Sequence, residues 1–219
     1  MLKRIALVLG AVWLLVMPVR AQPDPVLSMP LERRVAQMFM VTLHGAGMTE
    51  VGAQFLRQYQ PGGVVLFAAN VTTPDQVTRL TNDFQRTITE AGGPPLLIAI
   101  DQEGGVVARL TQGFTVFPSP FVTTAAGDEM AYRAGQIVAQ ELRAVGINMN
   151  LAPVADLITN RNNPIIQRRS YSNSPDIGGR TIAQIVRGTQ SMNVLATVKH
   201  FPGHGESTHD SHGELGSIN

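Results

Sequence analysis

The sequence of 219 residues contains no cysteine. This absence excludes disulfide bonds, catalysis by a thiol, and a lipid carried on a cysteine behind a leader segment. Stability in an oxidising compartment would then depend on core packing alone. Hydrophobic residues make up 44% of the chain and glycines number 21, which is typical of a globular protein. The length is enough for one domain with a sizeable core.

Charge is scarce, because Asp, Glu, Lys and Arg together make up only 15% of the residues. Residues 1–21 hold three of the 17 basic residues and none of the 16 acidic ones. Without that segment the chain has 14 basic against 16 acidic residues, a formal charge of −2. No basic run remains that could follow a phosphate backbone, so we expect no nucleic-acid partner.

Long apolar runs are also absent. The 13-residue segment IALVLGAVWLLVM (5–17) is shorter than the roughly 20 residues that span a bilayer. Lys3 and Arg4 precede it, and Val19 and Ala21 place small residues before a possible cut. Residues 1–21 are therefore predicted to be a secretory signal peptide, with an uncleaved membrane anchor as the alternative. We expect an exported protein, periplasmic or secreted, without stable membrane insertion after cleavage.

Apolar runs alternate with amphipathic patterns along the rest of the chain. The expected strands are 38–43, 62–67, 95–101, 147–156 and 194–201, and the expected helices are 49–59, 72–92, 129–146 and 177–192. This alternation predicts a parallel sheet covered by helices, either an open doubly wound sheet or a (β/α) barrel. No G-x-G-x-x-G follows the first strand, which disfavours a dinucleotide-binding sheet.

Polar residues recur where the expected strands end, at Asp101, Asp156 and Lys199. Active sites of (β/α) barrels lie on that rim, so the sequence predicts an α/β fold of the (β/α)8 TIM-barrel class. Such barrels have eight strands and about 250 residues, whereas only five strands are expected here. We therefore expect residues 22–219 to form a partial barrel domain, present through about strand 5, and the sequence to be a fragment.

Titratable groups are concentrated in KHFPGHGESTHDSHGEL (199–215), which carries a lysine and four histidines. Three glycines and a proline in this stretch exclude an ordinary helix. A second notable stretch is DQEGGVVARL (101–110), where Asp101 follows a strand and precedes a Gly-Gly pair. A carboxylate in that place could accept hydrogen bonds from two neighbouring sugar hydroxyls, or could instead cap a helix or join a loop ion pair.

Together, DQEGG, INMNLAPVAD, RRSYS and KHFPGHG followed by DSH resemble the N-terminal domain of glycoside hydrolase family 3. More narrowly, they resemble its bacterial β-N-acetylhexosaminidase branch, over roughly residues 30–219. The resemblance implies a (β/α)8 barrel, in agreement with the strand alternation. It implies a carbohydrate substrate containing N-acetylglucosamine and no cofactor or metal.

The resemblance also assigns roles to single residues. Those that would bind the sugar are Asp101, Arg109, Arg169, Lys199 and His200. His212 is similar to the branch's general acid/base, with Asp210 as its dyad partner. An imidazole titrates near neutrality and can protonate a leaving oxygen, then deprotonate water. Asp156 has only a structural match.

The family's nucleophile is an aspartate tens of residues beyond DSH, so the resemblance gives that role to no residue of this chain. The expected reaction is retaining, exo-acting release of N-acetylglucosamine from peptidoglycan-type glycans, and the 219 residues alone are expected to be inactive. A departure from the family is Val106, where many relatives carry a basic residue.

Four alternatives stay open from the sequence. His200, His204, His209 and His212 have spacings that could suit a zinc-dependent hydrolase. Two others keep the family: a β-glucosidase, or a phosphorylase that transfers the sugar to phosphate. The last is a non-catalytic glycan-binding remnant.

Overall fold

A computed structural model describes residues 26–210, 212 and 213. The predicted signal peptide, residues 1–21, lies outside these described residues. Within them, no helix combines the length and the apolar character that crossing a bilayer requires.

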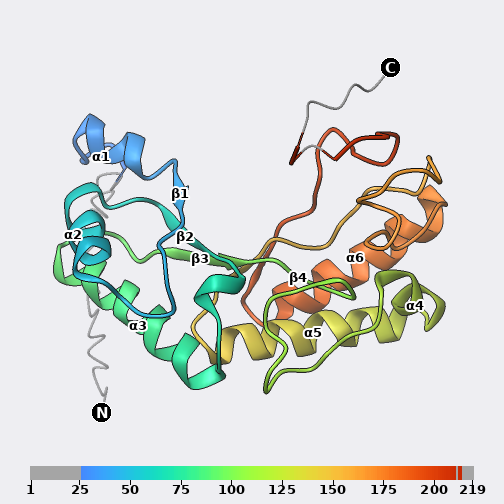
Figure 1. Cartoon of the computed structure of the whole chain (residues 1–219), viewed down its shortest axis with the longest axis horizontal. Coiled ribbons are helices and arrows are strands. Elements are labelled where there is room, and N and C mark those ends of the chain that lie inside the picture. Colours follow the sequence, from blue (N-terminus) through green and yellow to red (C-terminus); the bar gives the residue numbers. More distant parts are fainter. Residues whose placement is uncertain (1–25, 211, 214–219) are drawn as a thin grey trace, which may run out of the picture.

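Five parallel strands form one sheet in sequential order (Figure 1). They are β1 (Met40–Val41), β2 (Gly63–Leu66), β3 (Leu97–Ile100), β6 (Met149–Asn150) and β7 (Leu195–Ala196). Their register aligns Val64 with Ile98 and Asn150 with Ala196. All five expected strands and their parallel arrangement are confirmed, as in part of a (β/α)8 barrel.

The two C-terminal strands are shorter than the sequence patterns 147–156 and 194–201 predicted. Pro153 has no N–H to donate, which interrupts the ladder after β6. Pairing resumes at a single parallel bridge between Val154 and Lys199. Lys199 and His200 therefore follow β7 by several residues, although the bridge keeps Lys199 beside the strand end.

The four expected helices are α2 (Glu50–Tyr59), α3 (Pro74–Glu90), α5 (Asp128–Ala144) and α6 (Pro175–Ser191). Thr49 caps α2 by accepting from the N–H of Gly52, and Thr73 caps α3 by accepting from that of Gln76. Two short helices were not predicted, α1 (Leu31–Ala36) and α4 (Pro120–Ala125), nor was a 3-10 turn, η1 (Ala68–Asn70).

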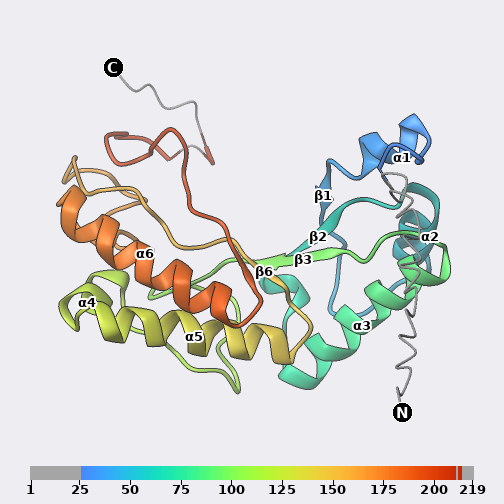
Figure 2. The same cartoon turned by 180° about the vertical axis from the view of Figure 1, so that it is seen from behind.

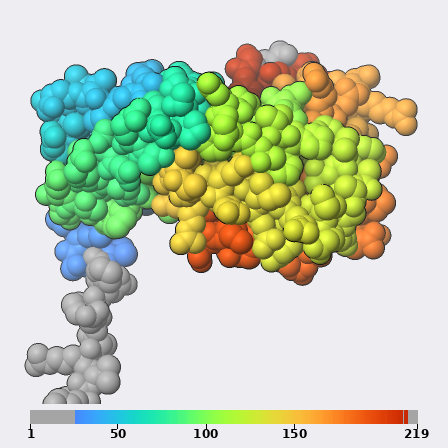
Figure 3. Space-filling view, turned by 90° about the horizontal axis from the view of Figure 1, so that it is seen from below, coloured from blue at the N-terminus to red at the C-terminus, as the bar shows by residue number. Residues whose placement is uncertain are grey.

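Each of these helices except α1 and α4 connects two neighbouring strands, and the views from front and back place them on one side of the sheet (Figures 1 and 2). Seen from below, they form a continuous surface from α2 and α3 in cyan and green to α5 in yellow (Figure 3). The segment after β7 runs on the opposite side (Figure 1).

Helices α5 and α6 pack side by side at unusually close range. A Cβ on Gly135 of α5 would lie 2.4 Å from the carbonyl oxygen of Ile185, and one on Gly188 of α6 would lie 2.1 Å from that of Tyr132. Only glycine permits this approach of two backbones.

The main core lies between the sheet and helices α2, α3 and α5. Its buried side chains include Val64, Leu66, Ile98, Ile100, Leu56, Phe84 and Leu142. Burial of each such large side chain contributes about 1.5–3 kcal/mol. The core therefore holds β2 and β3 rigidly, and with them the residues that follow β3.

The chain after β3 forms a hairpin that the sequence did not predict, of β4 (Gln102–Gly104) and β5 (Val107–Ala108). Its turn is possible because Gly104 and Gly105 have φ of 88° and 59°, values that favour glycine. The hairpin carries the DQEGG motif across the rim of the sheet.

Candidate active site

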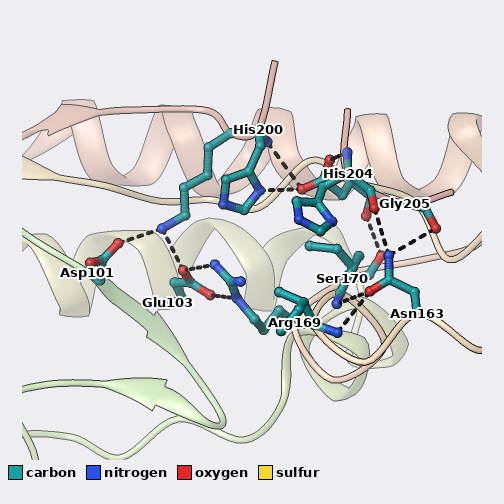
Figure 4. Close-up of polar contacts among 12 residues, drawn as sticks. Asp101, Glu103, Asn163, Arg169, Ser170, His200, His204 and Gly205 are labelled. Carbon is teal, nitrogen blue, oxygen red and sulfur yellow. Dashed lines mark hydrogen bonds and ion pairs between the residues drawn. The ribbon is translucent and has the colours of Figure 1, made fainter. Parts of the chain in front are cut away.

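The candidate site lies where β3, β6 and β7 end. Parallel strands bring their carboxyl ends to one edge, so Asp101, Asp156 and Lys199 meet there although up to 98 residues separate them. Figure 4 shows Asp101, Glu103 and Arg169 on one side of the site and His200 and His204 on the other.

Asp101 and Lys199 form a direct ion pair. The Lys199 Nζ lies 2.6 Å from Oδ1 of Asp101, and the two side chains keep about one sixth of their surface exposed. Arg109 is more distant, with Nη2 3.9 Å from Oδ2 of Asp101. The structure thus brings together three of the residues that the sequence predicted to bind a sugar, and it leaves part of each accessible.

Glu103 links Arg169, a further predicted sugar-binding residue, to the pair of Asp101 and Lys199. Its carboxylate accepts two hydrogen bonds from Arg169, from Nε and Nη2, both at 2.8 Å. Lys199 Nζ lies 2.6 Å from the same carboxylate. The Glu103 side chain is only 1% exposed, and a buried charge of this kind requires such pairing. The hydrogen bonds from Glu103 raise the pKa of the Arg169 guanidinium.

Sequence reasoning missed Glu103. The signal that could have found it is the alternation of side chains in an extended chain, which points residues 101 and 103 to the same face. Its two cationic partners lie 66 and 96 positions later in the chain, so the pairing itself is visible only in the fold.

The loop that carries Arg169 is tied to the segment after β7. The buried Asn163 accepts from the N–H groups of Ile165 and Ile166, which shapes the loop. Its Nδ2 donates to the carbonyl of His204 at 2.7 Å and also reaches that of Gly205. Arg169 therefore approaches Glu103 from a loop that cannot shift independently of the histidine-rich segment.

His200 points its Nδ1 at Asp156, with 2.5 Å between Nδ1 and Oδ2. The backbone N–H groups of His200 and His204 also donate to this carboxylate. Asp156, for which the sequence suggested only a structural match, is thus part of the site. Burial alone would raise the pKa of Asp156, but the hydrogen bonds from His200 and His204 outweigh it and lower the pKa.

Asp210 and His212 are in contact, as their spacing of two residues allows. Asp210 Oδ1 accepts from the backbone N–H of His212 at 3.0 Å and lies 2.6 Å from its Nδ1. The backbone hydrogen bond, followed by the side-chain one, lowers the pKa of Asp210. The two side chains are 45% and 81% exposed, so this pair is far more open than the Asp101 group.

A cleft of about 710 Å³ borders the segment after β7, and it coincides only in part with the ion-paired group. Asp156, Lys199 and His200 line it, whereas Asp101, Glu103, Arg109 and Arg169 do not. Its walls also include the apolar Val198 and Phe201 of the segment after β7.

No three groups of the types His, Cys, Asp and Glu lie within reach of one metal ion in the described part of the chain. Within that part of the chain, His200, His204, His209 and His212 therefore do not form a set of metal ligands, despite their spacing in the sequence. The zinc-dependent alternative has no geometric support among these residues.

A family model described as the glycosyl hydrolase family 3 N terminal domain matches residues 30–219. Among curated proteins, β-hexosaminidase A of Pseudoalteromonas piscicida is 39% identical over 166 residues, which cover 73% of this chain and 28% of that protein. A β-hexosaminidase of Pseudomonas aeruginosa is 35% identical over 175 residues, covering 79% of this chain and 51% of its own length.

Solved structures give the same picture. A glycoside hydrolase family 3 β-N-acetylglucosaminidase from a Paenibacillus species matches with a TM-score of 0.84 and 41% identity, over 87% of this chain and 36% of that one. Native NagZ from Neisseria gonorrhoeae matches with a TM-score of 0.74 and 32% identity, over 81% of this chain and 52% of that one. The chain thus spans about half the length of these relatives, or less. The fold, the rim motifs and the family match agree, and the chain belongs to the glycosyl hydrolase family 3 N-terminal domains, in their hexosaminidase branch.

Proposed function

We propose that this chain contributes the sugar-binding and acid/base residues of a retaining exo-β-N-acetylhexosaminidase. The enzyme would release terminal N-acetylglucosamine from peptidoglycan-type glycans. The observation that carries the proposal is the rim group in which Asp101 pairs with Lys199 while both stay partly exposed. The names of the relatives, β-hexosaminidase and β-N-acetylglucosaminidase, support the choice of sugar.

Sugar binding would use the exposed faces of the ion-paired residues. The Asp101 carboxylate can accept from two hydroxyls, while Lys199, Arg109 and His200 offer further polar contacts. Glu103 pairs with both Arg169 and Lys199 and keeps them in place. A ligand hydroxyl therefore meets preoriented groups, and little ordering has to accompany binding.

Proton transfer would be carried out by His212. In the first step its Nε2–H protonates the glycosidic oxygen while a carboxylate attacks the anomeric carbon and the aglycone leaves. In the second step the neutral imidazole takes a proton from water, which displaces the carboxylate. Asp210 holds Nδ1–H throughout and stabilises the imidazolium before the first step and after the second.

The attacking carboxylate is, in our proposal, an aspartate outside residues 1–219. On this view the 219 residues bind the sugar without turnover. We also propose that the enzyme is exported, because export would bring it to peptidoglycan. Mass spectrometry of the protein recovered from outside the cytoplasm should then find Gln22 as the first residue, whereas retained residues 1–21 would contradict cleavage.

The substrate assignment is tested with the whole gene product and two chromogenic substrates. An aryl N-acetyl-β-glucosaminide should be hydrolysed much faster than the matching aryl β-glucoside. Faster hydrolysis of the aryl β-glucoside would instead identify the enzyme as a β-glucosidase. Added phosphate should leave free N-acetylglucosamine as the product, and a sugar 1-phosphate would identify a phosphorylase.

A further inference from the structure

The carboxylate of Asp156 contacts three nitrogens of the segment after β7. Oδ2 accepts from the backbone N–H of His200 at 3.2 Å and lies 2.5 Å from Nδ1 of the same residue. Oδ1 accepts from the backbone N–H of His204 at 2.6 Å. The side chain is 1% exposed, so these contacts replace the water that the charge has lost.

This contact determines which nitrogen of His200 carries a hydrogen. The hydrogen bonds that lower the pKa of Asp156 keep it ionised near neutral pH. An ionised carboxylate is only an acceptor, so Nδ1 must be the donor. In the neutral ring, Nε2 is then left as an acceptor.

The side chain of His200 is partly accessible, and it lines the cleft together with Asp156 and Lys199. This side chain is 35% exposed, and since Nδ1 is held against a buried carboxylate, Nε2 is the ring nitrogen that remains for a ligand. Figure 4 shows the His200 ring across the site from Asp101 and Glu103. Among cations and acids at this rim, an acceptor on neutral imidazole offers a complementary partner for a hydroxyl hydrogen.

The main chain of Asp156 makes a second connection. Its carbonyl accepts from Oγ of Ser170 at 2.6 Å, and Ser170 directly follows Arg169. One residue thereby joins the loop of Arg169 to the segment of His200 and His204. The side chain contacts the His200 segment, and the main chain contacts the loop of Arg169.

We propose that Asp156 is a positioning residue that fixes His200 in its Nδ1–H tautomer and presents Nε2 as an acceptor for a ligand hydroxyl. The tautomer assignment is independent of the proposed function. The identification of this hydroxyl as one of N-acetylglucosamine does rest on the proposed function.

Nitrogen-15 NMR of the labelled 219-residue chain tests the tautomer without any ligand. The His200 ring is assigned by the loss of its signals in His200→Gln and observed at a pH where it is neutral. Nδ1 should show the shift of a protonated nitrogen and Nε2 that of an unprotonated one. A hydrogen on Nε2 in the unaltered chain overturns the proposal, whether or not any Asp156 variant folds.

The variant Asp156→Asn sharpens the test, because a neutral amide with one acceptor oxygen holds Nδ1–H less strongly than a carboxylate with two. The share of the Nε2–H tautomer should then rise while the circular dichroism spectrum stays unchanged. Asp83→Asn, the same change at an exposed helical ion pair, is the matched control and should leave the ring as it was. A folded Asp156→Asn chain whose ring shifts equal those of the unaltered chain shows that the carboxylate does not set the tautomer, and it also overturns the proposal.

A double-mutant cycle tests the consequence for binding. N-acetylglucosamine is titrated into the unaltered chain, Asp156→Asn, His200→Ala and the double variant. Loss of one hydrogen bond corresponds to a weakening of about 3- to 10-fold in Asp156→Asn. This effect should disappear in the His200→Ala background, whereas equal losses in both backgrounds show that Asp156 does not act through His200. If the unaltered chain does not bind the sugar, the proposed function fails, and the nitrogen shifts still decide the tautomer.

Discussion

Two aspartate–histidine pairs occur at this end of the molecule, and they share a contact but differ in exposure. Asp156 lies 2.5 Å from Nδ1 of His200, and Asp210 lies 2.6 Å from Nδ1 of His212. The acids are 1% and 45% exposed, and the histidines 35% and 81%. The same pairing is therefore built once into the body of the fold and once on its surface.

Burial decides what each pair can do. A buried acid that loses its partners leaves uncompensated polar groups, which costs several kcal/mol. An exposed pair contributes little to stability because water and salt screen it. Under the proposed function, the exposed imidazole would exchange protons with a substrate and with solvent. The comparison teaches that the Asp156 pair holds geometry and that the Asp210 pair suits chemistry.

Replacing His212 with alanine should separate the two roles most clearly. In the whole gene product, His212→Ala should lower kcat by about 10²- to 10⁴-fold, the usual contribution of general acid–base catalysis. The thermal midpoint should stay where it was, because the side chain is exposed. Steady-state kinetics on an aryl N-acetyl-β-glucosaminide checks the first expectation. An unchanged kcat would remove His212 from the mechanism.

Glu103 is buried like Asp156. Its replacement should therefore lower the stability of the fold, in contrast to His212→Ala. Glu103→Gln keeps the shape but leaves Arg169 and Lys199 without their shared anion, so we expect a loss of about 3–5 kcal/mol in the free energy of unfolding. Urea denaturation of the 219-residue chain measures it. Glu50→Gln, which breaks the exposed pair with Arg57, is the control and should cost less than about 1 kcal/mol. If the two variants lost the same free energy of unfolding, burial would not be the reason why the Glu103 pairs stabilise the fold.

Much of the fold could be read from the sequence, because its main elements have local signals. Thr49 and Thr73 act as caps, and the apolar runs of β2 and β3 are buried as their composition predicted. The rim positions of Asp101 and Lys199 followed from strand ends alone. The lengths of β6 and β7 could not be read in this way, because they depend on how Pro153 interrupts pairing between strands.

The site was predictable only where one residue carries the signal. Motif resemblance indicated Asp101, Arg109, Arg169, Lys199, His200, Asp210 and His212. The structure brings the first four into one ion-paired group, in which Glu103 contacts Arg169 and Lys199. Glu103 and the contacts of Asp156 were missed, because their meaning depends on partners at least 44 positions away. Exposure was not predictable either, since D-x-H reads the same on a surface or in a core.

The pH dependence of stability should distinguish the buried acid from other aspartates. Asp156 has a pKa below that of an unfolded aspartate, near 3.9, so its stabilising effect is complete above that value and lost as the pH falls through the folded pKa. At pH 7, Asp156→Asn should lower the free energy of unfolding by about 1–3 kcal/mol. Urea titrations between pH 7 and pH 3 should show the difference from the unaltered chain shrinking below about pH 4. A difference independent of pH would mean that the carboxylate's charge is not what stabilises the segment.

The smallest effect is expected from the exposed partner, Asp210. Its pKa is also lowered, by the backbone and side-chain N–H groups of His212, yet these donors belong to a turn that solvent surrounds. Asp210→Asn can still accept the backbone hydrogen bond, so the thermal midpoint should show no resolvable shift at pH 7. The same variant should reduce kcat of the whole gene product, because an amide no longer stabilises the imidazolium of His212. A fall in stability comparable to that of Asp156→Asn would instead place the D-x-H turn within the folded framework and remove the distinction between the two pairs.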